Sequence, residues 1–305
     1  MLSLHRRVAA VCCLLITGAV ASAQAQERLR WKFEEGDTTN YQIVQDMDIK
    51  MSVAGQNIDS KMTQTMDMGW AVESVADDGT AKLKQKISRI QMKMTSPLGN
   101  VEYDSSQEEQ PADLVGAQLA KVFGAMVGKD FTMTMTPRGE IKDVTIPEEL
   151  AQALEGAGGG AVPGGGGFNA ESLKQLASQS GVEFPEEPVG QGKNWSGKTE
   201  AKLPFGTMKL DNQFTYQGAE RRGGQALQKI GVKPKISIEP DPNAQVQMTV
   251  KSQDASGTIY FDNQEGRIAE STMKQNLDME LNAGGMAITQ SIAQTMTMKL
   301  LPAAE

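Results

Sequence analysis

Hydrophobic residues fall at every second position over long stretches of this chain. Over residues 41–53 the odd-numbered positions are apolar except for Gln45. Over residues 62–72 the apolar residues fall on even-numbered positions instead, except for Gln64. A period of two places apolar side chains on one face of an extended strand. The pattern therefore predicts long strands that are buried on one face.

The next segment predicts a third strand and then a helix. A turn is expected at residues 77–79, followed by a strand whose phase changes at Ser88, as a β-bulge would produce. Residues 111–128 are expected to form a helix, with Pro111 in its first turn and Gly128 at its end. The apolar stripe of this helix consists of Val115, Leu119, Val122, Phe123 and Met126.

The rest of the chain predicts strands around a glycine-rich interruption. A hairpin is expected over residues 131–144 and short helices over residues 148–154 and 169–178. Residues 156–167 contain eight glycines in twelve positions, which favours a flexible insertion; a phosphate-binding loop is disfavoured because no P-loop lysine follows. Further strands are expected over residues 195–203, 207–216, 226–238, 245–251, 258–261, 268–281 and 287–300.

These elements predict a mainly β protein. We expect a large curved, mostly antiparallel sheet or half-barrel with one to three helices on one face. Residues 26–150 would form an N-terminal β half, residues 151–186 the glycine-rich insertion with a short helix, and residues 187–305 a C-terminal β half. Both halves are expected to belong to one domain.

Residues 1–25 have the organisation of a signal peptide. Arg6 and Arg7 precede an apolar run, and small residues then allow cleavage after Ala25 or, alternatively, after Ala23. The apolar run is too short to span a bilayer comfortably, and no later segment is long and apolar enough to do so. The sequence predicts export by the secretory route to the periplasm, the cell surface or the medium.

Composition narrows the chemistry further. His5, Cys12 and Cys13 lie in the predicted leader, and no other histidine or cysteine occurs. A Ser-His-Asp triad, a cysteine nucleophile and an ordinary zinc site are therefore excluded in the mature chain. Without Arg6 and Arg7 the 30 basic residues fall to 28 against 38 acidic ones, a net charge of about −10. This charge and the lack of a basic cluster disfavour nucleic acid as a partner, and no cofactor is predicted.

The first and last hairpins resemble each other at an offset of 230 residues. The motif QTMxM occurs at residues 64–68 and again at residues 294–298. Two-residue turns at residues 54–55 and 284–285 would bring the apolar positions of each hairpin onto one face. In that register glutamine lies opposite glutamine, in the pairs Gln45/Gln64 and Gln275/Gln294.

Methionines recur at i, i+2 spacing on the predicted strands, and three interpretations compete. The simplest is a core filled with flexible side chains; the others are an adaptable apolar cavity for a lipid-like ligand and a thioether Cu(I) site. Copper is disfavoured because no histidine or cysteine supports it, and no other metal is predicted. The candidate ligand-binding residues are Met66, Met92, Met133, Met296, Gln45, Gln64, Gln275 and Gln294.

Carboxylates are the strongest remaining basis for an enzyme, as in a glycoside hydrolase. The candidate pairs are Glu102/Asp104 and Asp262/Glu265, which fall in predicted turns or on polar strand faces. Aromatic residues, on which sugars usually stack, make up only 5% of the chain. We therefore expect a non-enzymatic binding module first, a structural or envelope-interaction protein second and a carboxylate-based hydrolase third.

Three short stretches carry a resemblance to a known family. They are LRWKF at residues 29–33 followed by Gly36 and Asp37, VGQGKNW at residues 189–195, and the strand–turn–strand of residues 261–268. In these the chain resembles an uncharacterised family of exported bacterial β-rich proteins, a domain of unknown function of planctomycete type. The resemblance implies a β-rich exported protein and supplies no catalytic residues. The expected architecture is also similar to the half-barrels of periplasmic lipoprotein carriers, an analogy that does not fix function.

Overall fold

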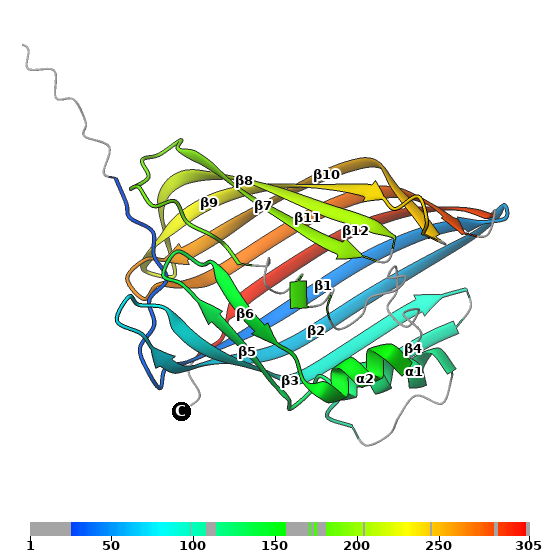
Figure 1. Cartoon of the computed structure of the whole chain (residues 1–305), viewed down its shortest axis with the longest axis horizontal. Helices are drawn as coiled ribbons and strands as arrows, with labels where there is room; N and C mark the ends of the chain where they lie inside the picture. The colour runs from blue at the N-terminus through cyan, green and yellow to red at the C-terminus, as the bar shows by residue number, and fades with distance from the viewer. Residues whose placement is uncertain are drawn as a thin grey trace, which may run out of the picture.

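One curved antiparallel sheet organises the molecule. The computed structural model describes residues 26–97, 99–107, 114–156, 171, 174–175, 181–203, 205–244, 246–283 and 286–302. The twelve strands follow the order β6-β5-β3-β2-β1-β12-β11-β10-β9-β8-β7, with β4 also paired to β3 (Figure 1). The predicted large, curved, mainly antiparallel sheet is confirmed. Its strands are β1 (Thr38–Val53), β2 (Gln56–Val75), β3 (Ala81–Ser96), β4 (Gly99–Asp104), β5 (Asp130–Met135), β6 (Ile141–Thr145), β7 (Asn194–Leu203), β8 (Gly206–Arg222), β9 (Gln225–Pro240), β10 (Val246–Asp262), β11 (Arg267–Ala283) and β12 (Met286–Leu300).

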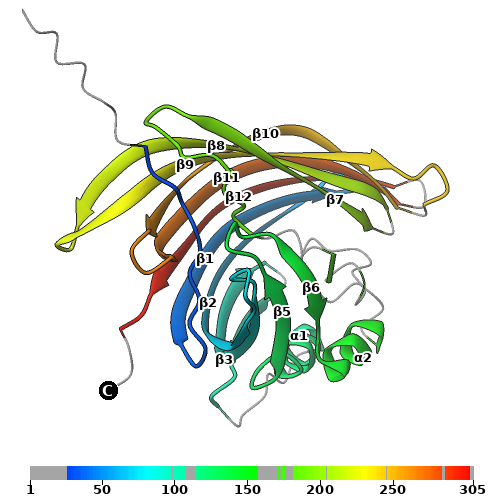
Figure 2. The same ribbon diagram turned by 60° about the vertical axis from the view of Figure 1, so that its left-hand side comes forward.

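Two described helices lie beneath the arch of the sheet (Figure 2). Helix α1 (Leu114–Gly124) packs against β4, where the rings of Phe123 and Tyr103 lie 5.5 Å apart. Helix α2 (Glu148–Gly156) packs on α1 through Leu150 and Val122, which form one small apolar cluster. Neither described helix combines the length and apolarity that a membrane span requires.

The helix predicted over residues 111–128 ends earlier than expected. Residues 111–113 lie outside the described part of the chain, and α1 ends at Gly124. The chain then makes tight turns until Gly128, which has a φ of 75° and donates its amide to the Ile87 carbonyl at 2.8 Å. Gly128 therefore directs the chain into β5, because a positive φ suits glycine at a reversal of direction.

Residues 245–251 and 258–261 are predicted as two strands; residue 245 lies outside the described residues, and the others are parts of the single strand β10. The residues between them are mostly small or polar, so they carry little hydrophobic signal. They nevertheless pair with β11, with one register shift between Val250 and Ser252. The prediction was wrong here because the ladder of backbone hydrogen bonds continues across a segment that buries few apolar side chains.

The sheet divides between β9 and β10. These two strands pair only where residues 257–261 of β10 lie opposite residues 228–232 of β9. Outside this stretch β9 pairs with β8 alone, and β10 pairs with β11 alone. Pro234, which lacks an amide hydrogen, lies two residues beyond the last pair on β9. The Gln253 side chain crosses the gap. Its Oε1 accepts a hydrogen bond from the backbone amide of Ile236 at 2.7 Å, and its Nε2 donates one to the backbone carbonyl of Ile236 at 2.6 Å.

The two similar hairpins lie next to each other in the sheet. Because β1 pairs with β12, the local order is β2-β1-β12-β11. Both predicted registers are confirmed, with Gln45 opposite Gln64 and Gln275 opposite Gln294. The predicted bulge is also confirmed, because the pairing of β2 with β3 skips Ser88. The turn at residues 284–285 lies outside the described residues.

Three clusters of buried apolar side chains cover the concave side of the sheet. The first joins one end of the sheet to the segment of residues 26–37, and its members include Leu29, Trp31, Phe184 and Phe261. The second lies under α1 and includes Tyr41, Ile90, Met92 and Leu119. The third joins the β7–β8 turn to β10 and β11 through Leu203, Phe205, Met248 and Met279.

Parts of the predicted domain plan fall outside the described residues. These are the leader of residues 1–25, with its cleavage site, and residues 157–170, 172–173 and 176–180 of the insertion, which include most of the helix predicted over residues 169–178. Residues 181–186, which the sequence assigned to the insertion, pack into the first cluster through the fully buried Phe184. Strands from both predicted halves share one sheet, because β1 pairs with β12.

Candidate ligand-binding face

The central strands present an inner face without charge. We define the inner face as the alternating positions of β1, β2, β3, β11 and β12 that point to the side on which α1 and residues 26–37 pack. None of these described positions carries a charged side chain; they are Tyr41, Ile43, Gln45, Met47, Ile49, Met51, Ile58, Ser60, Met62, Gln64, Met66, Met68, Trp70, Leu83, Gln85, Ile87, Ile90, Met92, Met94, Ser271, Met273, Gln275, Leu277, Met279, Leu281, Ile288, Gln290, Ile292, Gln294, Met296, Met298 and Leu300.

Tyrosine does not add a charge to this face. The Tyr41 side chain is 2% exposed, and burial raises the pKa of its hydroxyl well above the ordinary value of 10. Tyr41 therefore stays neutral at physiological pH.

The opposite, outer face of the same strands is highly charged. Lys61 pairs with Asp48 at 3.3 Å, and Arg89 pairs with Asp104 at 2.6 Å. Open hollows of about 380, 460 and 310 Å³ occur among the described residues, and outer-face side chains such as Asp46, Thr63 and Lys274 line them. Charged side chains line each hollow, together with apolar ones such as Met47 and Val232. The charges of these strands therefore lie on the outer side.

Seven of the eight candidate residues lie in adjacent positions of the inner face. One row crosses five strands, because each member is the register partner of the next: Met92, Gln64, Gln45, Met296 and Met273. Gln294 and Gln275 lie in the neighbouring row, and Met66 lies on the other side of the first row. Met133 is separate, because it pairs with Leu83 from β5 and belongs to the first cluster.

Three of the glutamines form a hydrogen-bonded ladder. The Gln45 amide donates to the Gln294 carbonyl at 3.3 Å, and the Gln294 amide donates to the Gln275 carbonyl at 3.0 Å. The Gln45 amide also lies 3.1 Å from the sulfur of Met47. The alternation within each hairpin predicts the glutamine pairs, whereas the bond between the hairpins is not predicted, because the adjacency of β1 and β12 leaves no local pattern in the sequence.

Most side chains around the ladder are only half-buried. Gln45, Gln64, Gln275, Gln294 and Met296 all fall in this class. Met296 belongs to none of the three apolar clusters, which meet around it. This central area is therefore uncharged surface, with methionines beside the glutamines, that the described part of the chain covers incompletely.

One end of the inner face is closed by a plug of aromatic side chains. The plug consists of Leu29, Trp31, Phe184 and Val189, with Phe261 and Trp70 beneath them. The rings of Phe184 and Phe261 lie 4.7 Å apart in an edge-on contact, and Trp31 lies 5.4 Å from Phe261. Aromatic contacts of this kind add stability beyond the area that they bury.

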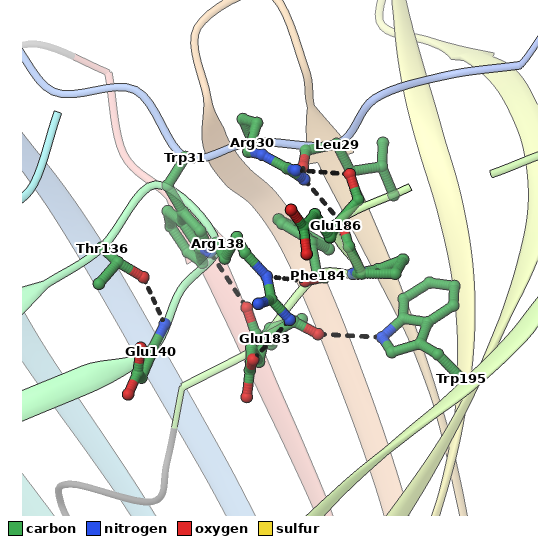
Figure 3. A network of polar contacts seen from close by, with 12 residues as sticks. Leu29, Arg30, Trp31, Thr136, Arg138, Glu140, Glu183, Phe184, Glu186 and Trp195 are labelled. Carbon is green, nitrogen blue, oxygen red and sulfur yellow. Dashed lines mark hydrogen bonds and ion pairs between the residues drawn. The ribbon is translucent and has the colours of Figure 1, made fainter. Parts of the chain in front are cut away.

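Polar contacts fix the plug between opposite edges of the sheet (Figure 3). Arg138, in the β5–β6 turn, donates to the Phe184 carbonyl at 2.9 Å and pairs with Glu183 at 2.8 Å. On the other side, the Trp195 indole of β7 donates to the Glu183 carbonyl at 3.0 Å. Residues 183–184 therefore link β5 to β7, which are far apart in the order of the sheet.

Arg30 completes the plug at its outer rim. Its guanidinium donates to the carbonyls of Leu29, Pro185 and Glu186 at 2.7–2.8 Å (Figure 3). Burial and the nearby Arg28 and Arg138 lower the pKa of Arg30. No sequence pattern predicts this network, because its acceptors are backbone carbonyls.

The candidate catalytic acids are engaged in structural contacts. Arg89 binds Asp104 through both carboxylate oxygens and holds the pKa of Asp104 well below its ordinary value, with help from Ser106 and Gln91. Glu102 pairs with Lys93 at 2.9 Å. Asp262 accepts the amides of Gln264 and Glu265, which fixes the β10–β11 turn. Among the described residues no cluster of His, Cys, Asp or Glu could hold a metal ion.

Comparison with known proteins gives distant similarities. No curated protein sequence matches this chain. A lipovitellin structure, solved for its lipid–protein interactions, superposes with a TM-score of 0.47 at 10% identity, covering 90% of this chain and 26% of its own. This chain thus spans about a quarter of that protein.

Two further structures align with most of the length of this chain. An outer membrane channel from Pseudomonas putida F1 has a TM-score of 0.26 at 8% identity, covering 89% of this chain and 97% of its own. A domain described as an outer membrane lipoprotein-sorting protein, from Vibrio parahaemolyticus, has a TM-score of 0.17 at 9% identity, covering 87% of each chain. None of the three TM-scores reaches 0.5, so they establish no shared function.

A family model matches part of the chain. The matched segment, residues 78–159, runs from the turn before β3 to just beyond α2. It lies between the first two stretches that suggested the resemblance, at residues 29–37 and 189–195. Over residues 78–159 the chain matches a family of unknown function, DUF6263, which confirms the expected similarity to a domain of unknown function.

Proposed function

We propose that this protein is an exported binding protein that holds an uncharged apolar ligand, such as a lipid, on its inner face. The observation that carries the proposal is the absence of charge from every described inner-face position of five adjacent strands. An ordinary core also lacks charge, but here the area around Met296 is half-buried and lies between the clusters. Partly exposed apolar side chains such as Met47, Met273 and Met296 favour a binding surface there.

Methionine suits this role for a physical reason. Its side chain is unbranched, flexible and polarisable, so a methionine-lined surface adapts to ligands of different shape. Met62 on β2 is the register partner of Met47 on β1, and Met296 on β12 is the register partner of Met273 on β11. A hydrolytic function has less support, because Asp104, Glu102 and Asp262 are occupied by the contacts described above.

The proposal is tested by placing a charge on either face of the same strand. A pyrene-labelled diacylglycerol serves as the probe, and its fluorescence reports transfer to the protein. Met296→Asp puts a carboxylate on the inner face, and we expect at least tenfold weaker binding because charge is costly in an apolar site. Thr297→Asp, on the outer face one position away, is the matched control and should bind like the wild type.

Two outcomes would contradict the proposal. One is that wild-type protein takes up no probe; the other is that both aspartate variants bind equally well. Met296→Leu keeps the apolar character and should keep binding, which separates lost affinity from lost folding. A folded protein that binds no probe would favour the alternative, a structural protein whose methionines only fill the core.

A further inference from the structure

We propose that the glutamine ladder of Gln45, Gln294 and Gln275 binds the carbonyl group of a neutral ester- or amide-linked lipid. This inference rests on the proposed function, because it names the ligand class of the same face. The three amides lie on the adjacent strands β1, β12 and β11 and are linked by bonds of 3.3 and 3.0 Å. They form a polar stripe across a face that is otherwise mostly apolar.

The ladder has donors left over. Each glutamine amide carries two N–H groups, and the bonds in the ladder use one from Gln45 and one from Gln294. Among the described contacts, the Gln275 amide nitrogen donates to no residue. Its register partner on the next strand is Ala255, whose methyl group offers no acceptor. A half-buried donor without a protein acceptor favours a ligand or water that supplies one.

Apolar side chains flank the ladder on both sides. Along β11, Met273 precedes Gln275 and Leu277 follows it; along β12, Ile292 precedes Gln294 and Met296 follows it. A ligand lying along the strands would therefore place its apolar parts on either side of the stripe. Its one polar group would then meet the ladder in the middle.

The lack of charge decides which polar group fits. A carboxylate or phosphate on the inner face would find no cation among the described inner-face positions, and burying an unpaired anion is costly. An ester or amide carbonyl accepts a hydrogen bond and carries no charge, so it matches the spare donors of Gln275 and Gln294. The ladder therefore favours neutral lipids over free fatty acids and phospholipids.

The test compares an ester and an alkane of the same chain length, together with a shorter carboxylate. Hexadecyl palmitate has an ester carbonyl in mid-chain, dotriacontane is the alkane without it, and palmitate carries a carboxylate. We expect wild-type protein to prefer the ester over the alkane by about tenfold, the effect of one net hydrogen bond. Palmitate should bind more weakly than the ester.

Two variants locate the preference. The double variant Gln275→Met/Gln294→Met keeps the side-chain volume but removes the amides, and it should bind ester and alkane equally. Asn276→Met, on the outer face beside Gln275, is the matched control and should keep the tenfold preference.

The outcomes separate the two proposals. If the double variant keeps the preference for the ester, the ladder is not the carbonyl subsite, although the face still binds apolar ligands. If wild type prefers the alkane or palmitate, the ligand class is wrong. If none of the probes binds, the proposed function itself fails. Association of two chains through the inner face, without any lipid, would likewise overturn both proposals, because a second copy would then cover that face.

Discussion

At the scale of single residues, the inner face is defined by which side chains are left out. No charged residue occupies it, and its polar residues are mostly glutamine, which can hydrogen-bond without titrating. Glycine has an equally local role. At Gly257, a Cβ atom would lie 3.0 Å from the sulfur of Met273, so the missing side chain gives Met273 its place on the face. Gly139 likewise leaves room for the plug, because a Cβ there would meet Trp31 and Val182.

Gly139→Ala should therefore disturb the plug. Gly139 has a φ of 95°, and a Cβ there would lie 2.1 Å from the Val182 carbonyl and 2.6 Å from the Trp31 indole nitrogen. The change would also break the Trp31–Val182 hydrogen bond, which is 3.1 Å long. We expect a loss of about 3 kcal/mol in the free energy of unfolding, measured in urea, together with a shift in tryptophan fluorescence.

Gly55→Ala is the matched control for that change. Gly55 also has a positive φ, of 81°, but nothing lies within 4 Å of the added methyl group. Only backbone strain should result, which costs about 1–2 kcal/mol. Equal losses in the two variants would show that the contacts of residue 139 do not hold the plug.

At the scale of elements, the sequence predicted most strands and the pairing within hairpins. Alternation located β1, β2, β11 and β12, and turn geometry then fixed their registers. It could not show that β10 is continuous, because residues 252–257 contain too few apolar side chains. Nor could it show that β9 and β10 separate, because that depends on where two distant strands stop pairing.

Gln253→Leu tests how the divided sheet is held. The Gln253 side chain satisfies both backbone groups of Ile236, as a neighbouring strand would. Losing both bonds should cost about 2 kcal/mol and should speed hydrogen exchange at the Ile236 amide, observed by NMR. Gln247→Leu, at an exposed position of the same strand, is the control. Unchanged exchange at Ile236 in the Gln253 variant would refute this role.

At the scale of the whole molecule, the candidate site is built from contacts that are distant in sequence. Seven of the eight candidate residues lie close together because β1 pairs with β12. The plug joins residues 26–37, the β5–β6 turn and residues 181–189. Neither arrangement leaves a periodic pattern, so the sequence predicted the face but neither the bond between its halves nor the closure of its end.

The pairing of β1 with β12 should make the chain unfold as one unit, and an engineered disulfide tests this. Ser52 lies opposite Thr289 across β1 and β12, and opposite Asn57 across β1 and β2. Directly opposed residues in antiparallel strands have Cα separations suited to a disulfide. The mature chain has no other cysteine to compete, because Cys12 and Cys13 lie in the predicted leader.

The two possible disulfides differ mainly in the loop that they close. Ser52→Cys/Thr289→Cys closes a loop of roughly 240 residues, whereas Ser52→Cys/Asn57→Cys closes only the hairpin turn. If the whole sheet unfolds together, the long loop should stabilise the oxidised protein by about 3 kcal/mol more than the short one, and calorimetry should show a single transition in both. Reduction should abolish the difference. Two separate transitions, or equal stabilisation by both disulfides, would mean that the halves unfold independently and that the inner face can open along the β1–β12 seam.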